Sequence, residues 1–187
     1  RCNGTGRMYE TSVEELIGEH ARNMLDGEDY SLHGMGREDV DVLSLGTGRP
    51  FILEINKPKK RDLSLEIFEK IVNEGAGGKI EVDSLRPSSR KEVPKIKDGT
   101  SKKSYRAIIS SNKAFDEESL KYNISLLAQS PIRQRTPTRV VHRRADKIRE
   151  RSIHNIGSKI LSDGRAQIDL LTDGGLYIKE LLHGDDG

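Results

Sequence analysis

Short apolar segments with helical or strand periodicity alternate along this chain without the regular spacing of β-α-β units, and this pattern most constrains the fold. Ser12 and Glu15 have capping-box spacing at the start of the first amphipathic segment. Helices are predicted over Thr11–Leu25, Leu63–Glu74 and Asp116–Gln129, and strands over Phe51–Ile55, 78–86 and 103–110. The irregular alternation favours an α+β domain with a mixed or mostly antiparallel sheet.

Glycine-rich and basic segments connect these elements. Residues 26–42 contain three glycines and several acids, and they are predicted to form a loop. Residues 139–153 are expected to be a strand leading into a basic stretch. Two short apolar runs, 160–161 and 167–171, flank a Ser-Asp-Gly turn and predict a hairpin. A short helix is expected from near Leu176 through YIKELL.

Composition excludes several classes of protein. The 187 residues suffice to bury a core, and no apolar run approaches the roughly 20 residues of a membrane span. A single cysteine, Cys2, excludes an internal disulfide framework, so we expect a reduced, cytoplasmic protein. Cys2 stands at the start of the chain and could instead be the last member of a zinc-binding set with upstream partners.

Basic residues are segregated although the net charge is only +2. Eight Arg or Lys residues lie between Arg133 and Arg151, and a second basic stretch runs from Arg90 to Arg106. Acidic residues concentrate elsewhere. Such segregation is typical of a nucleic-acid-binding face, and the alternative is an ordinary solvated surface.

Other familiar motifs fail. GAGGK at 75–79 lacks the first glycine of a phosphate loop, and Ile80 follows where Ser or Thr is required. The histidines have neither HxxxH spacing nor a cysteine partner, so we predict no metal site. No glycine-rich loop suits the cofactor of a methyltransferase.

Three motifs do fit together. Gly36–Asp39 resembles the Gly-Arg-x-Asp catalytic motif of pseudouridine synthases, KKSYRAII at 102–109 resembles their tyrosine-containing strand, and GGLYIKELL at 174–182 resembles their third motif. They occur in the family's order. The wider wording, including GTGRPF and QRTPTRVVHRRAD, is similar to the archaeal and eukaryotic tRNA pseudouridine synthases that act on the T arm.

The resemblance implies roles for matching residues. Asp39 corresponds to the catalytic aspartate, Tyr105 to the tyrosine that stacks on the base, and Lys179 to the basic residue that pairs with the aspartate. It also implies a central mixed sheet with the active site in a cleft across it, tRNA as partner, uridine 54 or 55 as target, and no metal or organic cofactor. The expected RNA contacts are Arg37, Arg106, Arg135, Arg139, Arg143 and Arg144.

These roles make physical sense, and each has an alternative. A cation beside a buried carboxylate opposes the rise in pKa that burial causes, and an aromatic face stacks on a base extracted from its helix. Taken alone, Tyr105 would be a core residue and Lys179 a surface lysine. Asp41 is the rival for the catalytic role, because it would lie on the same side as Asp39 of an extended segment.

The related enzymes carry an additional N-terminal RNA-binding domain with a cysteine-rich zinc site. We therefore expect residues 1–10 to be the remnant of that region and residues 11–187 to be the catalytic domain. A monomer without membrane association is expected. The alternative function is a catalytically silent RNA-binding module.

Overall fold

The structure is a computed structural model that describes residues 9–37, 39, 41–99, 101–141 and 144–184. The chain forms two compact units, residues 1–99 and residues 100–187. Both contain helices and antiparallel strand pairs, which confirms the expected α+β class. The described residues form three small sheets, of two, three and two strands. The prediction of one catalytic domain over residues 11–187 stays a prediction.

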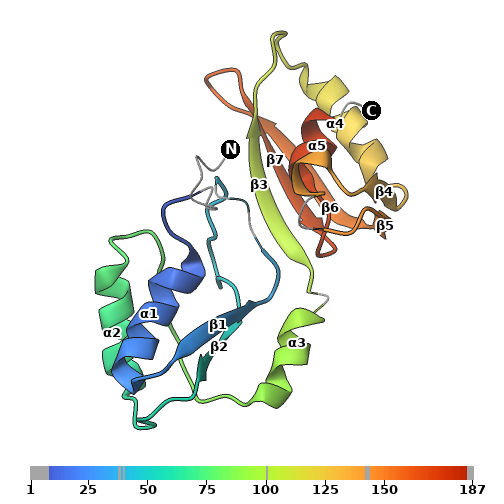
Figure 1. The fold of residues 1–187 in the computed structure, drawn as a ribbon. Coiled ribbons are helices and arrows are strands. Elements are labelled where there is room, and N and C mark those ends of the chain that lie inside the picture. The colour runs from blue at the N-terminus through green and yellow to red at the C-terminus, as the bar shows by residue number, and fades with distance from the viewer. Residues whose placement is uncertain (1–8, 38, 40, 100, 142–143, 185–187) are drawn as a thin grey trace. The chain divides into compact units, whose positions relative to one another are not determined.

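Two helices and a hairpin build the first unit. Helix α1 (Val13–Leu25) begins at the predicted capping box, where the Ser12 hydroxyl accepts from the Glu15 amide and the Glu15 carboxylate accepts from the Ser12 amide at 2.9 Å. Helix α2 (Leu65–Gly75) lies beside α1 (Figure 1). Ile17 and Ala21 of α1 and Phe68 and Val72 of α2 belong to one hydrophobic cluster, the first core.

The prediction of a loop over residues 26–42 is wrong for its first part. Residues Asp29–Gly34 form strand β1, which pairs antiparallel with β2 (Phe51–Asn56). The strand was hard to predict because its pairing partner begins 17 residues after it ends, beyond a glycine-rich loop. Leu32 packs against the first core from this strand, opposite Leu53.

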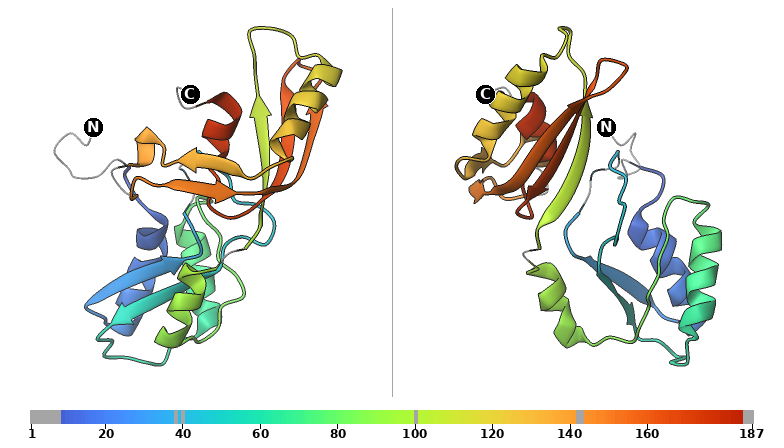
Figure 2. Two further views of the ribbon diagram at one scale, coloured as in Figure 1. Left: turned by 90° about the vertical axis from the view of Figure 1, so that its right-hand side faces the viewer. Right: turned by 180° about the vertical axis from the view of Figure 1, so that it is seen from behind.

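The predicted strand over residues 78–86 is also wrong. Its apolar alternation is real, because Ile80 packs against the core and Val82 belongs to it. Among the residues that the structure describes, no strand pairs with this segment. Instead, the Asn73 side chain donates to the Val82 carbonyl and accepts from the Val82 amide, both at 2.8 Å. The chain then forms η1 (Arg90–Glu92) and α3 (Val93–Lys97), which lies on the opposite side of the β1–β2 hairpin from α1 (Figures 1 and 2).

The second unit is a three-stranded sheet with two helices on one face. The strands are β3 (Lys103–Ile109), β6 (Ile153–Ile160) and β7 (Ala166–Thr172), in the order β3-β7-β6. The predicted hairpin is confirmed, since β6 and β7 flank the turn at Gly164, whose φ is 81°. Helices α4 (Glu117–Leu127) and α5 (Ile178–His183) cover the same face (Figures 1 and 2).

Beside this sheet lies a small hairpin of β4 (Ile132–Arg135) and β5 (Ile148–Arg151). The short helix η2 (Thr138–Val140) occupies part of their connection. The predicted strand over 139–153 therefore corresponds to a short helix and then β5. Isoleucines and leucines of α4, α5, β6 and β7 form the second core, with Ile168 fully buried.

Candidate active site

The loop between β1 and β2 carries Asp39. Its ends are held together, because the Met35 amide donates to the Pro50 carbonyl at 3.0 Å and extends the ladder by one step. Gly36 turns the chain with a φ of 85°, a conformation that glycine adopts without steric cost. The Asp39 carbonyl accepts from the Val42 amide at 3.1 Å, and Asp39 is half-buried. The loop is thus anchored at both ends and turned at Asp39.

The neighbours of Asp39 differ from it in exposure. Arg37 and Asp41 are exposed, whereas Asp39 is half-buried. Burial is what distinguishes a carboxylate held against the protein from one in solvent. This difference favours Asp39 over Asp41 as the reactive carboxylate.

Tyr105 lies in the middle of β3, directly opposite Leu170 of β7. Alternate β3 residues are half-buried, and Tyr105 is one of those that pack against the second core. Its ring therefore points to the sheet face that α4 and α5 cover. Tyr105 is therefore a core residue in part, because it packs against the second core. The rest of its side chain stays exposed, which a stacking residue requires.

Arg106 points to the other face of the same sheet. Its Nε and Nη2 donate to the two carboxylate oxygens of Asp169, at 2.7 and 3.3 Å. The hydrogen bond from Arg106 lowers the pKa of Asp169 below its usual range, and a hydrogen bond from Gln167 has a smaller effect in the same direction. Successive strand residues face opposite sides, so Arg106 and Tyr105 do not act on the same ligand surface.

Lys179 is half-buried on α5, between residues that the second unit holds firmly. Ile178 and Leu181 pack against the second core, and Leu176 is part of it. Tyr177 occupies the N-cap position of the helix, and its backbone is bound by the Gln134 side chain of β4. Tyr105 and Lys179 are therefore positioned by one hydrophobic core.

Glu180, next to Lys179, is buried and paired. Its carboxylate accepts from Nε and Nη2 of Arg139, the latter at 3.2 Å. The Glu180 side chain is 5% exposed. Neither Glu180 nor Gln134 was predicted as a site residue. The one available signal was Glu180's place among the apolar residues of IKELL.

The predicted catalytic residues fall in different units. Asp39 belongs to residues 1–99, and Tyr105 and Lys179 belong to residues 100–187. In the second unit, Tyr105 packs against the hydrophobic core, and Lys179 lies on α5, whose Ile178 packs against the same core. The pairing of Lys179 with Asp39 stays a prediction.

The predicted RNA-binding arginines also differ in their surroundings. Arg135 forms two hydrogen bonds with Asp146, at 2.9 and 2.6 Å, and its side chain is 74% exposed. Arg144 is exposed beyond η2, and its amide donates to the Val140 carbonyl. The Arg139 side chain is 36% exposed, less than those of Arg106 and Arg135, at 67% and 74%. Arg143 lies outside the described residues, as does Cys2.

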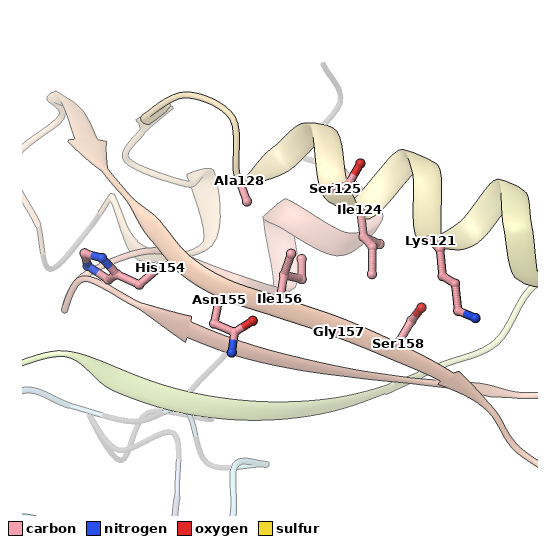
Figure 3. A pocket seen from close by; sticks show the side chains of 9 residues that line it. All are labelled: Lys121, Ile124, Ser125, Ala128, His154, Asn155, Ile156, Gly157 and Ser158. Atoms are coloured by element: carbon pink, nitrogen blue, oxygen red, sulfur yellow. The ribbon is translucent and has the colours of Figure 1, made fainter.

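An open groove of about 500 Å³ lies between α4 and β6, away from the predicted residues (Figure 3). Gly157 contributes to the hollow, because a side chain there would meet no atom within 4 Å. The groove is lined by Lys121, Ile124, Ser125, Ala128, His154, Asn155, Ile156, Gly157 and Ser158. None of the predicted site residues lines it.

Metal ligands and membrane spans were also sought. Within the described part of the chain, His, Cys, Asp and Glu side chains form no group of three or more that could hold a metal ion. Among the same residues, no helix has the length and apolar character required to cross a membrane.

Comparison with known proteins places these motifs in a family. The family model described as Pus10, C-terminal, matches residues 1–187. The tRNA pseudouridine synthase Pus10 of Methanothermobacter marburgensis is 49% identical over 189 residues, which cover 100% of this chain and 46% of that protein. The protein of the same name from Thermofilum pendens is 43% identical, over 96% of this chain and 41% of its own length. The chain thus spans less than half the length of these relatives.

Proposed function

The chain belongs to the Pus10, C-terminal, family, and on that premise we propose that it is the catalytic part of a tRNA pseudouridine synthase acting on uridine 54 or 55 of the T loop. The observation that carries the proposal is the match over all 187 residues, which includes the three motifs. The matched relatives bear the name tRNA pseudouridine synthase.

The proposed reaction breaks the N1–C1′ bond of uridine, turns the uracil and joins its C5 to C1′. The proton on C5 leaves and N1 gains a proton, so the product is an isomer of the substrate. Asp39 is the carboxylate that acts on the ribose, by attack at C1′ or by assisting elimination. Both routes need an ionised carboxylate. The proposed pairing of Lys179 with Asp39 supplies the positive charge that keeps it ionised.

Tyr105 is the proposed stacking platform for the uracil. The second core fixes the ring on the helix-covered face of the sheet, and a fixed aromatic face suits a base that is detached and then re-attached. Base stacking on an aromatic side chain contributes roughly 1–3 kcal/mol. Stacking of this size contributes to holding the uracil while its glycosidic bond is open.

Exposed arginines are the proposed contacts for the tRNA backbone. Arg37, two residues before Asp39 in the same loop, is the proposed residue that holds a phosphate or fills the space that the extracted uridine leaves. Arg135, Arg144 and Arg106 also present exposed side chains. Each phosphate contact contributes roughly −0.7 to −0.9 to the slope of log K against log salt.

The test uses chemical mapping of pseudouridine on a tRNA transcript incubated with the chain. Asp39→Asn removes the carboxylate charge at nearly constant size, and we expect product to fall below detection while tRNA binding persists. Asp41→Asn is the matched control, since Asp41 is an exposed carboxylate two residues away. Full activity in the Asp39 variant would refute the assignment. Binding by the unaltered chain without any product, even when the rest of a longer relative is supplied, would favour the silent RNA-binding module.

A further inference from the structure

We propose that Arg139 is a positioning residue for Lys179, acting through Glu180, and that it is not an RNA contact. The inference deepens the proposed function and rests on it, because Lys179 is the residue proposed to pair with the catalytic carboxylate. It reverses the prediction that charge segregation made for Arg139.

The burial of Glu180 is the first reason. This carboxylate is 5% exposed, and its two oxygens accept from Nε and Nη2 of the Arg139 guanidinium. Removing one partner of a buried ion pair is strongly destabilising, because the other charge stays buried. If Arg139 turned outward to a phosphate, Glu180 would lose these two hydrogen bonds. Arg139 is therefore committed to the protein, whereas Arg135, with an exposed partner, is not.

The shortness of α5 is the second reason. The helix has six residues, and helices of this length are not stable by themselves in water. Its side-chain positions therefore depend on what holds it from outside. Tyr177 is the N-cap residue of α5, and its side chain makes no capping hydrogen bond. The start of the helix is therefore also held by neighbouring elements.

Contacts with Gln134, with the second core and with Arg139 hold α5. The Gln134 amide donates to the Tyr177 carbonyl at 3.0 Å and accepts from the Tyr177 amide at 2.9 Å. Ile178 packs against the core. Arg139 binds Glu180. These contacts bracket Lys179 on both sides along the helix, so both residues next to it in sequence are fixed.

The hairpin of β4 and β5 thus links the basic stretch to the third motif. Gln134 belongs to β4 and Arg139 to η2, only five residues apart, and both bind α5. A displacement of this segment would move Lys179. Misplacing a catalytic group by about 1 Å can lower a rate by roughly 10²-fold.

The experiment compares Arg139→Lys with Arg165→Lys, a matched control that weakens an arginine–carboxylate pair of the second unit whose partner, Asp163, is 48% exposed. For Arg139→Lys we expect kcat for pseudouridine formation to fall by roughly 10- to 10²-fold. KM for tRNA and the salt slope of binding stay unchanged. Arg165→Lys leaves kcat unchanged.

A second measurement does not depend on activity. Amide hydrogen exchange in α5 should become about tenfold faster in Arg139→Gln, since local opening costs less. In the double variant Arg139→Gln with Glu180→Gln, no charge is left buried, so we expect much of the protection to return. A phosphate contact would behave differently, because the second substitution would restore nothing.

The outcomes separate the two proposals. A raised KM, a salt slope flatter by about 0.7–0.9 and unchanged exchange in α5 would overturn the inference and make Arg139 a phosphate contact. Absence of product with the unaltered chain would count against the proposed function. The exchange experiment would still show whether Arg139 holds α5.

Discussion

Helix α1 contacts β1 so closely at Gly18 that adding one methyl group should destabilise the first unit. A Cβ at Gly18 would lie 2.1 Å from Cδ2, 2.5 Å from Cε2 and 2.6 Å from Cγ of Tyr30. Contact with Cγ means that the ring cannot escape by turning about its own axis and must move as a whole. The Arg22 guanidinium lies 5.9 Å from the ring centroid, so that movement would also disturb Arg22.

Two effects of Gly18→Ala oppose each other. Alanine favours a helix interior by about 1 kcal/mol over glycine. Overpacking a filled site costs about 1–3 kcal/mol, and contacts this short belong at the upper end. We therefore expect a net loss of about 2 kcal/mol. Gly157→Ala is the control, because a Cβ there meets nothing within 4 Å and a strand glycine costs about 0.5–1 kcal/mol relative to alanine.

Urea denaturation followed by circular dichroism gives the free energy of unfolding, and amide exchange in α1 assigns the change to the first unit. Gly18→Ala should unfold at lower urea and exchange faster in α1. Gly157→Ala should be neutral or slightly stabilising. A Gly18→Ala protein as stable as the unaltered chain would mean that Tyr30 does not pack on α1 as described.

Three further predictions concern the core and the acid limb of stability. Leu176→Ala removes a side chain that is 5% exposed and should cost about 2–5 kcal/mol by urea denaturation, whereas Ile148→Ala, at 61% exposed, should cost under about 0.5 kcal/mol. Hydrogen bonds from Arg86 and, to a smaller extent, Ser88 lower the pKa of Glu92 to about 2. The carbon-13 NMR titration of the Glu92 carboxyl should therefore have its midpoint near pH 2, and this midpoint should move to higher pH in Arg86→Met. The hydrogen bond from Arg135 lowers the pKa of the Asp146 carboxyl below its usual range. The ionised carboxylate therefore stabilises the fold above the usual aspartate pKa, and this contribution is lost as the pH falls. Asp146→Asn should flatten the fall in the free energy of unfolding below about pH 4, as measured by urea denaturation.

Local signals predicted the helices well because their determinants are close in sequence. The capping box of α1 needs only Ser12 and Glu15, which are three residues apart, and the structure contains both of its hydrogen bonds. Strands depend on partners that are distant in sequence. Residues 29–34 were predicted to be loop although β2 pairs with them. Residues 78–86 were predicted to be a strand, although the Val82 backbone is bound by the Asn73 side chain and not by a strand of the described residues.

The catalytic residues were predicted from motif order, and their roles stay predictions. Motif order pointed to Tyr105, which packs against the second core, and to Lys179, whose neighbour Ile178 packs against the same core. What the pattern could not give was the support for Lys179. Gln134 binds a backbone 43 residues away and Arg139 binds a carboxylate 41 residues away, and neither separation follows any local period.

Two arginine–carboxylate pairs of the basic stretch explain why a count of charges could not separate arginines that hold the fold from arginines that are available to RNA. Arg135 and Arg139 lie four residues apart, carry the same charge and each form two hydrogen bonds to one carboxylate. Their partners differ: Asp146 is 41% exposed and Glu180 is 5% exposed. Water can replace Arg135 at Asp146 at little cost, so that guanidinium remains available to a phosphate, whereas the buried Glu180 retains Arg139. The burial of the partner, which depends on the tertiary fold, therefore decides which arginines of a basic stretch can contribute to RNA binding.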